Sequence, residues 1–201
     1  PGRHNVANAL AAAIVGQAFD VPVEAIADVL RSFEGLPHRL EAVGERDGVL
    51  WVNDSQGTTP YATIPALSAH GRPPVVILGG VGKDADFTDL GREVVARARG
   101  AVLIGQAADE IAAAIEAARR ASLPTLRPRA GTSMELETGP IVRHAKDLAE
   151  AVEQARTLAQ PGDVVLLSPA CASFDMFASY EERGERFREL VREFASPVGA
   201  R

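Results

Sequence analysis

Hydrophobic and polar positions in the first part of the chain repeat with the period of an α-helix. Residues 5–19 are rich in alanine and carry apolar side chains at helical spacing, and residues 21–33 repeat that spacing after a proline near their start. These stretches predict a pair of helices. Gly35 and Pro37 then break the pattern, as expected of a linker. We therefore expect one domain to end at residue 35 and a second to occupy residues 36–201.

Three later stretches, residues 74–80, 101–105 and 163–168, are apolar almost throughout instead of alternating. An uninterrupted apolar run is expected of a strand that is covered on both faces. Stretches with helical spacing lie between and after these runs, at residues 89–98, 109–118, 147–159 and 180–194. Strands that alternate with helices predict an α/β fold with a Rossmann-like, doubly wound and mostly parallel sheet. Residues 122–139 show no clear period and receive no assignment.

A β-hairpin is predicted at the start of the second domain. Two short β-prone runs flank the loop at residues 45–48, which ends in a glycine. Thr58 and Thr59 follow the second run and precede Pro60, so they are placed to cap a helix that continues through Leu67.

Composition narrows the class of protein. A chain of 201 residues with 46% hydrophobic content can bury a core, and a net charge of −6 without a basic patch argues against nucleic acid or an anionic membrane as the main partner. One cysteine permits no internal disulfide, and no apolar run reaches the roughly 20 residues that span a bilayer. A cytoplasmic protein is the expectation.

Residues that follow the apolar runs carry most of the functional information, because ligands of open α/β sheets bind beyond the carboxyl ends of the strands. After the first run, Gly80 and Gly82 match a loose dinucleotide pattern, but no acidic residue ends the next strand. A Walker A loop is excluded by Ile77 and Asp84. What remains is Lys83 on a glycine-rich turn, which suits a carboxylate or phosphate, with a solvated surface lysine as the alternative.

Two other strand ends carry candidate chemistry. Asp54, Ser55 and Thr58 offer a carboxylate and two hydroxyls, either for a ligand or for helix capping. Cys171 lies in the run SPACAS and invites a nucleophile hypothesis, but all four histidines lie outside the strand-end stretches. The small residues instead favour a shelf where backbone N–H groups and Ser173 face a bound anion.

Five stretches together resemble one family. HNVANALAA, GLPHRLE, VNDSQGTTPYAT, ILGGVGKDADF and PGDVVLLSPACASFDMFASYEERGERF are similar to motifs of the Mur ligases, in particular of members that add D-glutamate. The resemblance covers almost the whole chain, more weakly over residues 105–146, but only the C-terminal part of such enzymes. It implies that residues 1–35 end the central ATP-binding domain and that the rest is the C-terminal, amino-acid-binding domain.

The resemblance also implies an activity. Mur ligases build peptidoglycan precursors, and so serve cell-wall synthesis, cell shape and cell division. ATP phosphorylates a carboxylate, here that of UDP-N-acetylmuramoyl-L-alanine, and the amine of D-glutamate attacks the acyl phosphate. The implied cofactors are ATP and Mg²⁺, the implied partners are these small molecules, and the full-length enzyme is expected to be a cytoplasmic monomer without nucleic-acid or membrane partners.

Motif by motif, the resemblance assigns site residues. The nucleotide would contact Asn5, Asn8, Arg39 at the phosphates and Asp54 at the adenosine end. D-Glutamate would contact Thr58, Lys83, Ser173, Phe174 and Tyr180. Gln56 departs from the family, which often has lysine there, and removes a cation near the nucleotide.

No catalytic or metal-ligating residue is assigned within the chain, because the glycine-rich ATP loop and the metal ligands of the family would lie upstream. The chain alone is therefore expected to be inactive. Two alternatives remain open at this point: a Mur-type ligase for another amino acid, and a ligand-binding domain without catalysis.

Overall fold

The computed structural model describes residues 3–122 and 139–195, in which helices and strands alternate after an initial helix pair. The helices are α1 (Arg3–Ala18), α2 (Val23–Ser32), α3 (Pro60–Ala66), α4 (Thr88–Arg97), α5 (Ala108–Ser122), α6 (Leu148–Leu158) and α7 (Tyr180–Arg192). The strands are β1 (Glu41–Arg46), β2 (Val49–Asn53), β3 (Pro74–Gly79), β4 (Gly100–Ile104), β5 (Ile141–His144) and β6 (Val164–Leu167). The unassigned stretch 122–139 lies outside the described residues except at its two ends.

The strands form one sheet in the order β1-β2-β6-β3-β4-β5. All neighbours from β2 to β5 pair in parallel, and β1 pairs antiparallel with β2. The predicted doubly wound sheet with an N-terminal hairpin is therefore confirmed. The hairpin turn is shorter than the predicted loop: Asp47 and Gly48 alone connect the strands, both with positive φ, as a two-residue hairpin turn requires.

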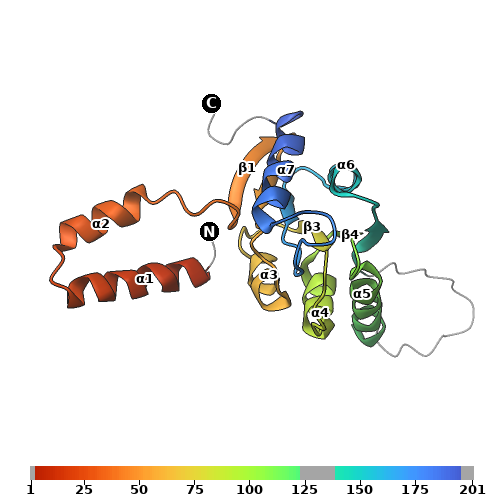
Figure 1. Cartoon of the computed structure of the whole chain (residues 1–201), viewed down its shortest axis with the longest axis horizontal. Coiled ribbons are helices and arrows are strands. Elements are labelled where there is room, and N and C mark those ends of the chain that lie inside the picture. Colours follow the sequence, from red (N-terminus) through yellow and green to blue (C-terminus); the bar gives the residue numbers. More distant parts are fainter. Residues whose placement is uncertain (1–2, 123–138, 196–201) are drawn as a thin grey trace, which may run out of the picture.

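Helices cover both faces of the sheet (Figure 1). In β3, Val76 and Leu78 join a core with α3, α4 and α5, whereas Val75 and Ile77 join a second core with α6 and α7. Each of these side chains is fully buried, which contributes about 1.5–3 kcal/mol per residue. This double burial explains why the central strands lack the alternation of a one-sided sheet.

Strand β5 has no counterpart in the sequence prediction. It has four residues, sits at the sheet edge against β4 alone, and leaves Ile141, Arg143 and His144 exposed. So short a strand, in which only Val142 packs against the core, carries neither an apolar run nor a clear alternation.

The helix pair α1–α2 lies to one side of the sheet (Figure 1). Helix α2 buries no residue, and large apolar side chains of the pair are exposed, among them Leu10, Ile14, Val15 and Val29. The division of the chain at residue 35 stays a prediction. Within the described residues, no helix has the length and apolar character needed to cross a membrane.

We predict that the helix pair opens locally far more easily than the sheet. Isolated helices of 16 and 10 residues are marginal in water, and this pair contributes little buried apolar surface. Amide hydrogen exchange of the 201-residue chain should give opening free energies of about 0–2 kcal/mol for α1 and α2, against the global value for β3. Equal protection of α2 and β3 in a demonstrated monomer would show this prediction to be wrong.

Candidate functional site

The three stretches that the sequence singles out follow neighbouring strands, since β6 lies between β2 and β3. Backbone hydrogen bonds join them directly. Ala170 N donates to Gly57 O at 2.8 Å, and Val81 and Ala172 exchange two hydrogen bonds at 2.9 and 3.1 Å. Residues 53–59, 79–86 and 168–175 thus form one continuous floor at the carboxyl edge of the sheet.

Small residues are required in this floor because the loops approach one another closely. A Cβ atom on Gly80, which has φ of 131°, would lie 2.2 Å from the carbonyl oxygen of Ala172. A Cβ atom on Gly57 would lie 2.7 Å from Ser168 Oγ and 2.8 Å from Asp54 Oδ2. The glycines that face the loop after β6 therefore have a steric explanation.

Asp54 is a buried carboxylate at the end of β2. Its Oδ1 accepts from the backbone N–H of Leu40 at 3.1 Å, and its Oδ2 accepts from Ser168 Oγ at 2.6 Å. Burial raises the pKa of Asp54 to about 6, against the opposing effect of these hydrogen bonds and of the nearby Arg39 charge.

Three of the residues assigned to the nucleotide surround one cleft of about 350 Å³. Asn8 from α1, the exposed Arg39 from the linker and Asp54 all line it. Asn5 lies one turn earlier in α1. The cleft also contains Gln56 and Tyr61, and sequence reasoning gave Tyr61 no role. A cation, a buried carboxylate and an aromatic ring around one opening suit the phosphate, ribose and base of a nucleotide.

Residues assigned to D-glutamate gather on the neighbouring loops. Lys83 Nζ lies 5.5 Å from the ring centroid of Phe174, within cation–π range. The Val81–Ala172 bridge holds these two loops together, and Ser173 is buried beside Phe174. Lys83 is exposed and has φ of 50°, so its backbone is held in a conformation that few residues adopt. Thr58 is half-buried at the end of the loop that carries Asp54.

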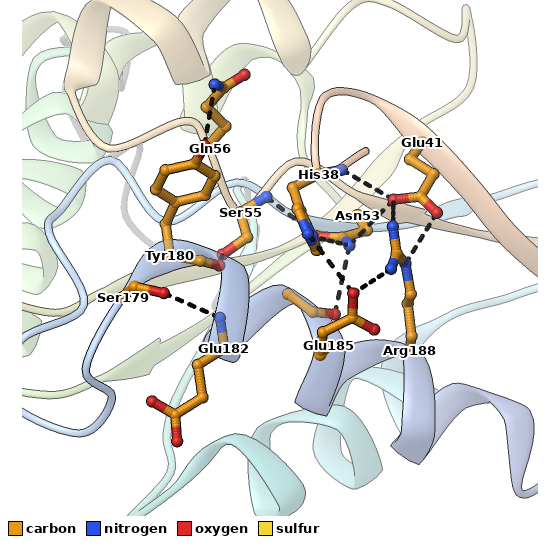
Figure 2. A network of polar contacts seen from close by, with 11 residues as sticks. His38, Glu41, Asn53, Ser55, Gln56, Ser179, Tyr180, Glu182, Glu185 and Arg188 are labelled. Carbon is orange, nitrogen blue, oxygen red and sulfur yellow. Dashed lines mark hydrogen bonds and ion pairs between the residues drawn. The ribbon is translucent and has the colours of Figure 1, made fainter. Parts of the chain in front are cut away.

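Tyr180 lies on the other side, against the loop after β2. Its carbonyl oxygen accepts from Ser55 Oγ at 2.7 Å, and its hydroxyl accepts from Gln56 Nε2 at 3.4 Å (Figure 2). The structure therefore brings Tyr180 to Gln56, at the rim of the nucleotide cleft.

Arg183 is the residue that sequence reasoning missed. Its side chain is 1% exposed, and it donates to Ser55 Oγ at 2.9 Å, Ser55 O at 2.9 Å and Cys171 O at 3.2 Å. Burial lowers the pKa of Arg183 to about 10. Its position was a usable signal, because Arg183 shares a helical face with the buried Phe187 and Leu190.

Cys171 is not an activated nucleophile. The thiol is buried, and burial raises its pKa to about 12, so it stays protonated at neutral pH. Its backbone carbonyl has the structural role, as an acceptor for Arg183.

The linker between the helix pair and the sheet is anchored to α7 by a polar network (Figure 2). His38 Nδ1 lies 3.0 Å from Asn53 Nδ2, and Glu41 accepts from Arg188 at 2.9 and 2.7 Å. Burial works against the charge of Glu41, but the hydrogen bond from Arg188 holds its pKa below the ordinary value. A Cβ atom on Gly184 would lie 2.2 Å from His38 Nδ1, so this helix position must stay small.

The described residues contain no group of three or more histidine, cysteine, aspartate or glutamate side chains that could hold a metal ion.

Comparison with known families agrees with this geometry. Residues 38–171 match the family model for the glutamate ligase domain of Mur ligases. This range includes the whole floor except the end of its third loop. The chain belongs to the Mur ligase family. The resemblance seen in the sequence motifs is thereby confirmed.

The curated relatives described here are Mur ligases named for the addition of D-glutamate. A UDP-N-acetylmuramoylalanine–D-glutamate ligase from Thiobacillus denitrificans is 48% identical over 197 residues, covering 98% of this chain and 37% of the relative. The corresponding ligase from Nitrosococcus oceani is 44% identical over 198 residues, covering 97% of this chain and 39% of the relative. The chain thus spans less than two fifths of the length of these two relatives.

Solved structures show the same fold at low identity. A UDP-N-acetylmuramate–alanine ligase from Thermotoga maritima has a TM-score of 0.65 and 16% identity, over 96% of this chain and 39% of that one. A folylpolyglutamate synthase from Mycobacterium tuberculosis has a TM-score of 0.60 and 18% identity, over 92% of this chain and 40% of that one. At these identities the likeness concerns the fold alone.

We predict that Asp54→Asn gains stability relative to the wild type as the pH rises through about 6. The folded-state pKa is raised, so the stabilisation that protonated Asp54 provides is present below about pH 4 and is lost as the pH rises through about 6. The variant lacks this titration, and its free energy of unfolding relative to the wild type should rise by about 2–3 kcal/mol between pH 4 and pH 7.5. Urea unfolding at both pH values measures this. Asp89→Asn, at an exposed site, is the control, and a pH-independent difference for Asp54→Asn contradicts the prediction.

We predict that Arg183→Met destabilises the domain by about 3–5 kcal/mol, because it leaves the buried carbonyls of Ser55 and Cys171 without their donor. Arg186→Met is the matched control on the same helix, at an exposed position, and should cost less than about 1 kcal/mol. Both are measured by chemical denaturation at pH 7. Similar losses in the two variants would remove Arg183 from its proposed structural role.

Proposed function

We propose that this chain is the C-terminal part of a ligase that joins D-glutamate to UDP-N-acetylmuramoyl-L-alanine at the expense of ATP. The curated relatives carry this activity in their names, and the chain aligns with them over nearly its whole length. The observation that carries the proposal is the contact between two sites. The nucleotide cleft at Asp54 and the cationic site at Lys83 lie on loops that share one hydrogen-bonded floor.

The Lys83 site suits the carboxylates of an amino diacid. Lys83 supplies a cation, and Phe174 lies beneath it, which restricts where the ammonium group points. Ser173 supplies a hydroxyl on the adjacent loop, and Thr58 a second one. Hydrogen bonds between charged groups and such donors are stronger than neutral ones, so the two carboxylates of D-glutamate find complementary partners while its amine stays free to react.

The cleft suits ATP. Arg39 would neutralise phosphate oxygens, Asp54 would accept from ribose hydroxyls, and Asn8 would contact the nucleotide from α1. Asn5 keeps the nucleotide contact that the family resemblance implies. The ionised form of Asp54 is the stronger acceptor, and the pKa of about 6 leaves Asp54 mostly ionised at neutral pH.

The reaction then has two bond-forming steps. A carboxylate oxygen of the UDP-sugar substrate attacks the γ-phosphorus of ATP, and ADP leaves. The amine of D-glutamate attacks the carbonyl carbon of the acyl phosphate, loses a proton, and phosphate leaves from the tetrahedral intermediate. The residues described above bind and orient the amino acid and part of the nucleotide. Mg²⁺ would be held by residues outside this chain.

The cellular location, partners and oligomeric state of the complete enzyme are also proposals. We propose that the enzyme acts on its small, charged substrates in the cytoplasm, without nucleic-acid or membrane partners, and supplies cell-wall precursors. We propose that the complete enzyme acts as a monomer.

We predict that Lys83→Met and Ser173→Ala, made in the complete protein that contains this chain, weaken D-glutamate binding selectively. A hydrogen bond to a charged group contributes roughly 1.5–3 kcal/mol, so each variant should raise the Michaelis constant for D-glutamate by about 10- to 100-fold. The Michaelis constant for ATP should change much less. Phosphate release with each substrate varied in turn measures both.

Matched controls use the same substitutions away from the floor. Lys146→Met and Ser68→Ala alter exposed residues and should leave both constants within about twofold of the wild type. If Lys83→Met behaves like Lys146→Met, Lys83 is a solvated surface lysine. If the complete protein releases no phosphate with ATP, D-glutamate and UDP-N-acetylmuramoyl-L-alanine together, the proposed function is wrong.

A further inference from the structure

A fourth loop joins the floor, although sequence reasoning assigned it no site residue. Residues 105–107 follow β4, and the backbone N–H of Ala107 donates to the carbonyl oxygen of Gly80 at 2.9 Å. The backbone N–H of Gln106 donates to Asp175 Oδ2 at 3.0 Å. The loop after β4 is therefore bonded to two of the three loops that form the floor.

Asp175 lies in the middle of a tight turn, residues 173–177, which we call the Ser173 turn. The turn is closed by Phe177 N, which donates to Ser173 O at 2.8 Å. Among the described residues, the bond from Gln106 is the one hydrogen bond that a side chain of this turn makes. Asp175 therefore anchors the turn to a loop that lies two strands away in the sheet.

The contact between Asp175 and the loop after β4 is close. Gly105 has φ of 70°, and a Cβ atom there would lie 2.2 Å from Asp175 Oδ2. The other carboxylate oxygen, Oδ1, is shielded from solvent and has no hydrogen-bond partner within the part of the chain that the structure describes. The link therefore rests on Oδ2, and any side chain at position 105 would displace it.

The position of the Ser173 turn matters for the amino acid more than for the nucleotide. Under the proposed function, Ser173 and Phe174 contact D-glutamate, and Asp175 follows them directly. A displacement of about 1 Å in a group that orients substrate can cost roughly 100-fold in rate. The loop that carries Asp54 bonds to the floor at Ala170, before the turn begins. A shift of the turn should therefore leave the nucleotide cleft largely unchanged.

We propose that Asp175 is a positioning residue for D-glutamate, which holds the Ser173 turn in place through its hydrogen bond to Gln106. The hydroxyl of Ser173 and the ring of Phe174 then meet the substrate at fixed positions. The inference rests on the proposed function for the identity of the amino acid. It adds the loop after β4 to the parts of the chain that shape the amino-acid site.

The first test removes the carboxylate in the complete protein. Asp175→Ala should raise the Michaelis constant for D-glutamate about 10-fold or more and leave that for ATP within about twofold. Asp175→Asn keeps an oxygen that accepts from Gln106 N and should stay within about threefold. This variant also separates the hydrogen bond from the charge, because burial lowers the pKa of Arg183 and the charge of Asp175 opposes that shift. Asp147→Ala is the control: it removes a half-buried carboxylate that accepts from Glu150 N at 2.8 Å, outside the floor.

The second test breaks the same contact from the other side. Gly105→Ala should raise the Michaelis constant for D-glutamate as Asp175→Ala does, because its Cβ atom would displace Oδ2. The double variant should fall well short of the product of the two single effects, since both remove one contact. Gly71→Ala is the matched control, with φ of 62° and open space around the added atom. It should leave both Michaelis constants within about twofold of the wild type.

The outcomes separate this inference from the proposed function. If ligation proceeds and Asp175→Ala resembles Asp147→Ala, or raises both Michaelis constants equally, the inference is wrong and the function stands. Equal effects of Asp175→Ala and Asp175→Asn would also overturn it, because the charge and not the hydrogen bond would be the cause. Thermal melting shows which variants are folded, and Gly105→Ala carries the test if Asp175→Ala is not.

If the complete protein does not ligate, the proposed function fails, and amide hydrogen exchange of the 201-residue chain still decides whether Asp175 holds the turn. The Phe177 amide, which closes the turn, should exchange about 10-fold faster in Asp175→Ala and in Gly105→Ala than in their two controls. Unchanged exchange of this amide in both variants would overturn the inference.

Discussion

The loops at the carboxyl edge of the sheet depend on the buried guanidinium group of Arg183. It is buried without a salt bridge in the described part of the chain, and its donors go to Ser55 and to the carbonyl of Cys171. A buried cation is expensive unless its donors are fully used, so the two loops are held where those acceptors meet it. Because one loop carries Asp54 and the other leads to Ser173, Arg183 links parts of both proposed sites.

Much of the fold was predictable because its signals are local. Residues 74–80 and 163–168 read as buried strands, since the apolar side chains of residues 75–78 and 164–167 pack in the two cores between sheet and helices. Strand β5 was not predictable, because three of its four residues are exposed and the stretch resembles a loop. The strand order was equally hidden: the insertion of β6 between β2 and β3 arises from pairing across more than 80 residues of sequence, which no short pattern records.

The candidate site, like the fold, was predictable from the sequence only in part. Asp54 and Lys83 were accessible to reasoning because each follows a strand, and strand ends form the ligand edge of such sheets. Arg183 was read as one charge among many on an amphipathic helix, although its spacing from Phe187 placed it on the buried face. The contact between Gln56 and Tyr180 joins residues 124 positions apart, and only the folded chain brings them together.

The state of Cys171 has a practical consequence for work on this chain. The sequence contains a single cysteine, and that thiol is buried and protonated. Thiol-directed reagents react with exposed thiolates, so we expect Cys171 of the native chain to react very slowly with maleimides and mild oxidants. A cysteine introduced on the helix pair would therefore accept a fluorophore or spin label without competition. The natural sequence already supplies the background that distance measurements between the helices and the sheet require.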